Sequence, residues 1–559
     1  MRKAKTITAS LLLTLTLLLS ACATPGEQSS NGSGVSNNSE EDKSSQTSSS
    51  LQEQEQDKNL TFALAWELDN LTPMFMSPQG EQCSMFVYET LVKYEDGKFL
   101  PGLAESWKFN EDNTELTFVL KQGVTFHNGE KFNAEAVKTA FDHQRKNPNA
   151  GFMRGISSIT EIEVVDEHTV KMHYAGPYFA TINDFVYPDV SAIAAPSMYE
   201  EGNFQTLKGV VGTGPYVYDE FVKGSHTTFT KFADYAGEKA YYDEITVKYI
   251  PDSGSRLMAL ETGEIDFMFA SSLMTYDEYQ QALTLPNIEG ALADTYGNVK
   301  NIAINASGNN MSEVKAITDV NVRKAIAMAI DKKVITEGLT YSMDMPATTL
   351  FPEGTAYTDV DMNNSWEYNP EKAAKLLEDA GWIMNKDTGI REKDGVALNL
   401  RFVYDSGVDI SEAYATAIDA QLAEIGIDVT TEGMEQMQWW MESFSGNYDM
   451  SVWNLPGSPE TPHSHFTSML DSNAEYAALL KMKDVQDVYD NINGFLTTAD
   501  KEKVGTHFDF LLNYINDNVV DIPISYGKEM IVYNSEKISD YDFYGATHFF
   551  DISGLKPVN

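Results

Sequence analysis

The sequence predicts an α/β protein built from at least two lobes. The chain has 559 residues, which exceeds the roughly 250–300 residues at which a single hydrophobic core usually stops growing. Strand-like and helix-like runs alternate along it, as at 245–250 and 369–381, and this alternation is typical of α/β folds. The sequence contains no short internal repeat, which argues against a solenoid.

Five apolar runs are predicted as strands, because several of them alternate apolar with polar residues at the period of a half-covered strand. They are residues 61–66, 116–120, 170–174, 245–250 and 398–404. Helices are predicted between them. The clearest runs from the cap Asn369 through Pro370 in the first turn to Gly381, which supplies a left-handed stop. A second helix is predicted over 322–330.

The first 21 residues are predicted to be a signal peptide. Three basic residues among the first five precede an apolar run over 11–19 that is too short to span a membrane. The ending Leu-Ser-Ala-Cys22 resembles a bacterial lipobox, which implies cleavage before Cys22 and a lipid on its sulfur. The alternative is a plain secretory signal in which Cys22 is incidental.

Residues 22–58 are predicted to form a flexible tether. Between Gly26 and Ser50 the only aliphatic residue is Val35, and such a segment buries too little apolar surface to offset the entropy of ordering it. At roughly 5–6 Å times the square root of its length, the tether would hold a folded body about 30 Å from its anchor. This reach suits a receptor standing off a membrane, whereas the alternative is a disordered tail without function.

The chain is strongly acidic, with 40 Lys and Arg against 83 Asp and Glu and a formal net charge of −43. Because nucleic-acid binding depends on basic residues that neutralise phosphates, that function is excluded, and binding to anionic membrane surfaces is disfavoured. Loss of the three basic residues of the signal peptide would deepen the charge to −46. Lipidation of Cys22 would leave Cys83 without a disulfide partner, and we expect Cys83 to be a buried apolar side chain.

Motifs for catalysis are missing from the sequence. It has no phosphate-binding glycine-rich loop, no nucleophile elbow in the folded part, no His-Glu-x-x-His and no Cys-x-x-Cys. We therefore expect no enzymatic activity, and any energy for transport must come from another chain. His463 and His465 would project from one face of an extended segment and could share a metal. Methionines and tryptophans over 434–441 are expected to be core or a pocket wall.

Six motifs, in order and spacing, resemble those of the family 5 solute-binding proteins of bacterial ABC importers. They are residues 104–107, 124–137, 212–216, 261–266, 322–325 and 369–382. The resemblance covers 59–559 and implies a two-lobed periplasmic-binding-protein-like fold of class II, with a hinge of two crossovers and the ligand enclosed between the lobes. It also implies ABC permease and ATPase partners, no cofactor, a monomer, and a place outside the cell, on the membrane through the lipid on Cys22.

The predicted domain boundaries follow from this resemblance. Lobe I covers 59–293, with an inserted subdomain at about 100–180, and lobe II covers 294–521. Residues 522–559 return to lobe I. The hinge crossovers are expected near 293–301 and near 521–524, because a strand run begins at each.

Two kinds of ligand are compatible with the family. Its peptide receptors hold the peptide amino terminus with an Asp in a Trp-x-x-Asp-type loop, but no Asp lies between Trp453 and Phe466 here. The loop over 457–463 instead is similar to that of nickel-type receptors. The resemblance thus favours nickel or a nickel chelate as the transported ligand, and a receptor for di- or oligopeptides is the alternative.

Several positions depart from the nickel-type pattern. Asp189 stands where an arginine would clasp chelator carboxylates, and Glu460 stands where an aromatic residue is expected. Ala474 replaces an expected histidine, for which His465 could substitute. Because these changes add negative charge, we expect a cationic ligand. The ligand-binding residues that the resemblance implies, with the two histidines as possible metal ligands, are Met76, Glu81, Phe152, Arg154, Asp189, Trp453, Glu460, His463 and His465.

Overall fold

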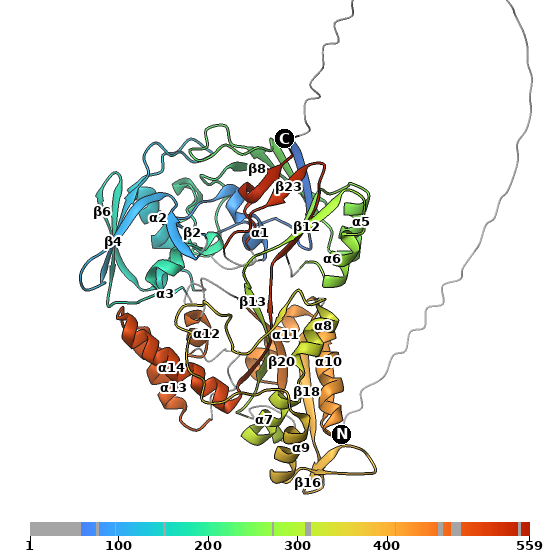
Figure 1. The fold of residues 1–559 in the computed structure, drawn as a ribbon. Coiled ribbons are helices and arrows are strands. Elements are labelled where there is room, and N and C mark those ends of the chain that lie inside the picture. Colours follow the sequence, from blue (N-terminus) through green and yellow to red (C-terminus); the bar gives the residue numbers. More distant parts are fainter. Residues whose placement is uncertain are drawn as a thin grey trace, which may run out of the picture. The chain divides into compact units, whose positions relative to one another are not determined.

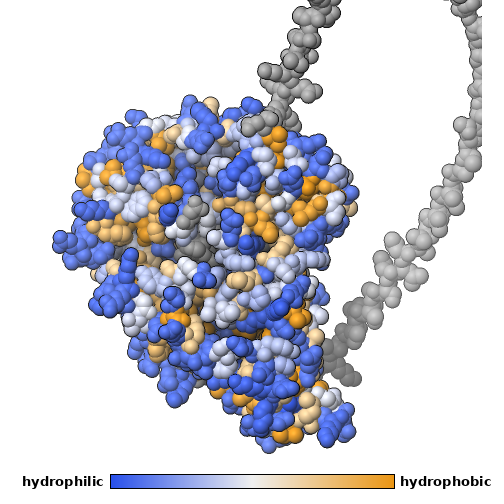
Figure 2. Space-filling model, viewed as in Figure 1, coloured by the Kyte–Doolittle hydropathy of each residue, from blue (hydrophilic) through white to orange (hydrophobic). Residues whose placement is uncertain are grey.

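The computed structural model describes most of the chain beyond the predicted tether. The described residues are 58–73, 78–95, 97–148, 153–270, 273–307, 315–408, 410–456, 462–470, 482–545 and 549–558. The predicted signal peptide, Cys22 and all but the last residue of the predicted tether lie outside them. Figure 2 shows that hydrophilic side chains cover much of the visible face of the folded unit, with apolar ones scattered among them.

Among the described residues, seven strands form the first large sheet, in the order β12-β22-β11-β1-β10-β9-β8. Their bounds are Ile288–Leu292, Met530–Asn534, Phe267–Phe269, Asn59–Leu64, Glu244–Tyr249, His226–Lys231 and Tyr216–Val222. β1 pairs in parallel with β10 and β11, whereas β22, from the end of the chain, is antiparallel to both of its neighbours. The helices α1 (Pro78–Val87), α5 (Ser253–Glu261) and α6 (Tyr276–Ala282) belong to the same region (Figure 1).

A second, antiparallel sheet has the order β4-β5-β7-β6. Its strands are Ala104–Phe109, Glu115–Leu120, Thr169–Tyr174 and Ile159–Asp166. The helix α2 (Ala134–Gln144) begins at Asn133, whose Oδ1 accepts a hydrogen bond from Ala136 N at 3.0 Å. Apolar residues of this helix and of the two sheets share one buried cluster, so they form one continuous core.

Six strands form the remaining large sheet, in the order β14-β21-β13-β20-β18-β19 within the described residues. Their bounds are Met345–Pro346, Asp521–Gly527, Asn298–Ile304, Met450–Pro456, Asn399–Asp405 and Asp428–Met434. Ile302 and Ile304 pack in one cluster with α7 (Val320–Ala329) and α10 (Ser411–Glu424), whereas Ala303 packs with Trp439 of α11 (Gln436–Ser445). Because neighbouring side chains of a strand point to opposite faces, these helices cover both faces of the sheet.

Local sequence signals correctly predicted helix α9 and five of the strands. Helix α9 (Pro370–Asp379) has Asn369 Oδ1 accepting from Lys372 N at 2.9 Å, and Gly381 follows with φ of +89°. The five predicted strands correspond to β1, β5, β7, β10 and β18 within two residues at each end. Cys83 is 0% exposed, as expected, and burial raises its pKa. No helix among the described residues is both long and apolar enough to cross a membrane.

Within the described residues the chain passes between the large sheets twice, and the two passages run side by side (Figure 1). The first is 293–297, between β12 and β13, and the second is 528–529, between β21 and β22. Ala293 N donates to Glu529 O, and Gly297 N donates to Gly527 O, both at 2.9 Å. The second passage follows the predicted 521–524, because β21 continues to pair with β13 as far as Gly527. We call residues 58–292 with 530–558 the first lobe, and residues 298–527 the second lobe.

Candidate functional site

The two lobes meet where a short segment of the first lobe enters the core of the second. Tyr178 and Ala180 are buried in the same apolar cluster as Phe466 and Phe508 of the second lobe. The ring of Phe179 lies 5.5 Å from that of Tyr357 and 5.8 Å from that of Phe508, in both cases edge to face. Edge-to-face aromatic pairs contribute roughly 0.5–1.5 kcal/mol beyond the area they bury. We call residues 178–180 and the second-lobe side chains they touch the interlobe contact.

His463 is part of the interlobe contact. It begins α12 (His463–Ser468), and its imidazole lies 5.7 Å from the ring of Phe179 and 6.3 Å from that of Tyr178. The residue is 5% exposed, and burial lowers its pKa to about 3. His463 is therefore neutral at physiological pH and retains a ring nitrogen lone pair.

His465 lies one position beyond Ser464 on the same helix and faces different neighbours. Its Nε2 lies 3.6 Å from Asp521 Oδ2, and its ring lies 5.7 Å from that of Phe351. Asn301 Nδ2 donates to the other carboxylate oxygen of Asp521 at 2.5 Å. The expectation of an extended segment is wrong, because this segment is helical. In a helix, residues two apart point away from each other, so the two imidazoles do not project from one face.

Three further predicted residues are described. Arg154 begins the short helix α3 (Arg154–Ser157) and is partly exposed. Burial raises the pKa of the nearby Tyr178 hydroxyl, and the positive charge of Arg154 opposes this rise. Asp189, in α4 (Pro188–Ser191), is 0% exposed, so its carboxylate reaches no open surface. Trp453, in β20, packs at 4.4 Å against the ring of Trp439. In the part of the chain that the structure describes, its buried indole N–H has no hydrogen-bond partner.

The other predicted site residues stay predictions. Met76, Phe152 and Glu460 lie outside the described residues, as does the side chain of Glu81, whose backbone belongs to α1. No group of three His, Cys, Asp or Glu side chains that could hold a metal ion occurs among the residues described.

Asn298 was not predicted from the sequence. It opens β13, where the chain enters the second lobe, opposite Pro456 and Gly527. It is 1% exposed, and neither polar atom of its side chain has a hydrogen-bond partner within the described residues. Leaving a buried amide unsatisfied costs about 1–3 kcal/mol, so Asn298 is a candidate for contact with ligand or water. The sequence around Asn298 gave no signal, because the residues that bury it are distant along the chain.

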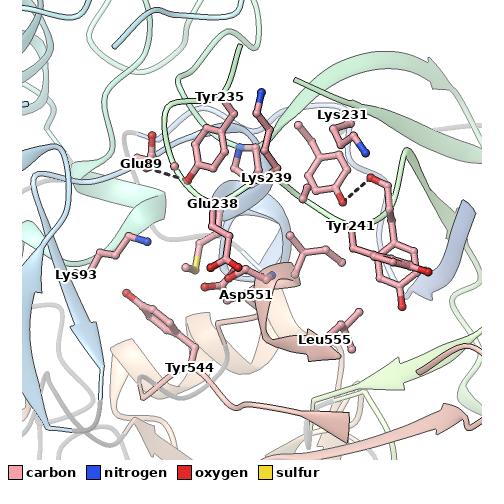
Figure 3. Close-up of a pocket in the computed structure, with 18 of the residues that line it drawn as sticks. Glu89, Lys93, Lys231, Tyr235, Glu238, Lys239, Tyr241, Tyr544, Asp551 and Leu555 are labelled. Atoms are coloured by element: carbon pink, nitrogen blue, oxygen red, sulfur yellow. Dashed lines mark hydrogen bonds between the residues drawn. The ribbon is translucent and has the colours of Figure 1, made fainter. Parts of the chain in front are cut away.

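A cavity of about 1050 Å³ lies elsewhere, wholly within the first lobe (Figure 3). Glu89 in its wall accepts hydrogen bonds from Thr213 Oγ1 at 2.9 Å and from Tyr235 Oη at 3.2 Å, and burial raises the pKa of Glu89. Tyrosine and lysine side chains, including Lys93 and Tyr544, also line the cavity. None of the predicted site residues is among its lining residues, so this cavity is separate from the interlobe contact.

Comparison with known proteins identifies the family. Residues 98–477 match the middle region of the bacterial extracellular solute-binding proteins, family 5. The chain belongs to this family. Its relatives are solute-binding transport proteins, so this family 5 protein binds a small ligand outside the cell, delivers it to an ABC permease and ATPase, and is not an enzyme. The predicted family is confirmed.

Individual relatives of this family 5 protein include metal and peptide receptors. The nickel-binding periplasmic protein of Escherichia coli K12 is 29% identical over 485 residues, which is 84% of this chain and 90% of that protein. The dipeptide-binding protein of the same organism is 24% identical over 420 residues, 70% of this chain and 74% of that protein. NikA from Brucella suis, solved with Fe(III)-EDTA, has a TM-score of 0.84 and 29% identity, covering 89% of this chain and all of that one. The predicted two-lobed fold is confirmed.

Proposed function

We propose that this protein captures nickel as a chelate between its two lobes and delivers it to its permease. The observation that carries the proposal is His463, a neutral imidazole held at the interlobe contact. Neutral imidazole is the form that binds borderline divalent metals such as nickel. A metal bound there would touch a helix of the second lobe beside aromatic side chains of the first, so its binding would favour the closed arrangement.

A chelate fits the described residues better than a bare ion does. A metal site built from protein alone needs several ligands, and the described residues offer no group of three. A chelator would supply the missing ligands, and Arg154, close to Tyr178, would pair with a chelator carboxylate. Relatives support this: NikA from Brucella suis was solved with Fe(III)-EDTA, and NikZ from Campylobacter jejuni, 20% identical with a TM-score of 0.76, was solved with Ni(L-His).

The burial of Asp189 weakens the expectation of a cationic ligand. Since its carboxylate is 0% exposed, it does not repel a chelator in the way that an open carboxylate would. We propose that the ligand set comprises Arg154, Trp453 and His463 together with Asn298. Met76, Glu81, Phe152 and Glu460 remain proposed members, and His465 is proposed to support the site through Asp521.

Calorimetric titration of the purified, metal-free protein tests the ligand. Three probes are compared: nickel alone, nickel with two equivalents of L-histidine, and a mixture of di- and oligopeptides. We expect strong heat from the nickel–histidine complex and at least a tenfold loss of affinity in His463→Ala. His226→Ala, in β9 of the first lobe, is the matched control. Heat from peptides alone would overturn the nickel proposal and support a peptide receptor.

We also propose that the protein is anchored to the outer face of the membrane by lipid on Cys22, as a monomer. The support is the lipobox-like ending before Cys22 and the polar composition of residues 22–58. Replacing Cys22 with Ala should move the protein from the membrane fraction to the medium or periplasm. Unchanged membrane association of that variant would contradict the anchor.

A further inference from the structure

A second connection joins the lobes beside the hinge, and it is polar. Helix α6 of the first lobe bonds to the segment that leads from α8 (Lys332–Leu339) into β14 of the second lobe. Tyr276 Oη donates to Asp344 Oδ1 at 2.5 Å, and the Tyr341 hydroxyl donates to Asp277 Oδ1. In Figure 1, α6 and α8 are neighbours across the boundary between the lobes.

Asp344 is the centre of this connection. It is 3% exposed, and its second oxygen, Oδ2, accepts from Ser525 Oγ at 2.8 Å and from Tyr414 Oη at 3.4 Å. Tyr414 and Ser525 also bond to each other at 2.8 Å. Both belong to the second lobe. Among the hydroxyl groups that contact Asp344 within the described residues, only that of Tyr276 comes from the first lobe.

The cluster adjoins both chain passages. Ser525 belongs to β21 and lies three residues before the second passage begins at Lys528. It pairs with Lys300 of β13, the strand that follows the first passage. Lys300 is 5% exposed and donates to Asn454 Oδ1 at 3.2 Å, and the negative charges of Asp344 and Glu529 act on its ammonium group. Glu529 lies in the second passage and is 4% exposed. A rotation of the lobes about these passages would therefore act directly on the bond between Tyr276 and Asp344.

The segment that carries Asp344 has an unusual backbone. Tyr341 and Ser342 are consecutive non-glycine residues with φ of +53° and +59°, and each such residue costs about 1–2 kcal/mol. Apolar packing of Met343 against the first-lobe cluster around α6, together with the Tyr341–Asp277 bond, holds this conformation. This unfavourable backbone conformation places Asp344 and Tyr341 within hydrogen-bond distance of the first lobe.

We infer that Tyr276 and Asp344 are positioning residues for ligand capture, whose bond across the lobes favours the arrangement in which residues 178–180 close on the second lobe. Bonds of Asp344 to Ser525 and Tyr414 lie inside one lobe and persist in every lobe arrangement. The Tyr276 bond spans the lobes, so it contributes only when they are placed as here, and it biases the equilibrium by its own free energy. This inference rests on solute capture between the lobes and is independent of which solute is bound.

The distance between the lobes in ligand-free protein tests the inference. Spin labels at Val165→Cys in the first lobe and Ile383→Cys in the second report it, since these side chains are 49% and 58% exposed. The full chain carries Cys22→Ala, and Cys83, which is 0% exposed, does not react. We expect Tyr276→Phe to shift the distance distribution towards more open forms.

Two controls separate positioning from simple stability. Tyr279→Phe removes a hydroxyl from the same helix without touching Asp344, and Ser525→Ala removes a bond to Asp344 inside the second lobe. Both should leave the distance distribution unchanged, although Ser525→Ala should lower the melting temperature.

With nickel and two equivalents of L-histidine as the probe, Tyr276→Phe should also weaken binding about tenfold. An unchanged distribution in Tyr276→Phe, or the same shift in Ser525→Ala, would overturn the inference. Absence of nickel binding in every variant would contradict the proposed ligand alone.

Discussion

The imidazole of His463 lies 5.7 Å from the ring of Phe179, and the two residues belong to different lobes. This contact places an aromatic side chain of the first lobe against an imidazole of the second. The imidazole is buried in this arrangement, and burial lowers its pKa to about 3. Opening of the lobes would hydrate it and restore a pKa nearer its ordinary value of about 6.5.

The first prediction concerns stability at acidic pH. Because the folded-state pKa of His463 is depressed, the unfolded chain binds a proton more readily below pH 6.5, and the stability present above that pH is lost as pH falls towards 3. Between pH 7.5 and pH 5 the loss from this group is about 2 kcal/mol. Urea unfolding of the wild type and of His463→Gln gives the free energy of unfolding at both pH values. The loss from His463 is the difference between the two proteins in how far this free energy falls from pH 7.5 to pH 5.

Other groups titrate over the same range, so the comparison of variants is essential. Asp449, whose pKa burial raises to about 6, changes stability in the opposite direction, since its contribution is lost as pH rises. It is present in both proteins and cancels. Equal pH dependence in the wild type and in His463→Gln would contradict the burial of a neutral imidazole.

The second prediction concerns Phe179 as the closing contact. Replacing Phe179 with Ala removes ring contacts to Tyr357, Phe495 and Phe508, all of them in the other lobe. We expect at least a tenfold loss of ligand affinity, because those contacts stabilise the closed arrangement that holds the ligand. Each lobe keeps its own core, so the melting temperature should fall by only a few degrees.

The control for this variant is Phe221→Ala, in β8, a partly buried phenylalanine of the first lobe. It should lower the melting temperature without changing affinity for the nickel–histidine probe. If Phe179→Ala unfolds the protein while Phe221→Ala does not, residues 178–180 belong to the second-lobe core in every arrangement, and the closing role is wrong.

The sequence predicted what short-range chemistry determines and missed what distant packing determines. Helix α9 could be read because Asn369, Pro370 and Gly381 set its ends within the segment itself. The helix at His463 could not, since a His-x-His pattern has no helical period and the segment gains its order from packing against distant aromatic side chains. The family motifs supplied the fold, but the partners of His463 follow from how two lobes meet.

The third prediction contrasts two asparagines of one strand. Asn298 and Asn301 are both buried in β13, at 1% and 0% exposure. Within the described residues Asn298 has no side-chain partner, whereas Asn301 Nδ2 donates to Asp521 at 2.5 Å. Replacing Asn298 with Leu removes an unsatisfied amide, so we expect the free energy of unfolding to rise by about 1–3 kcal/mol.

The same substitution should reduce ligand affinity at least tenfold, because a ligand that bonds to the amide of Asn298 would lose that bond. Asn301→Leu should instead lower the free energy of unfolding, since it deprives the buried carboxylate of Asp521 of a donor. Chemical unfolding and calorimetric titration of both variants measure the two effects. A destabilised Asn298→Leu with unchanged affinity would assign Asn298 to the fold and remove it from the ligand set.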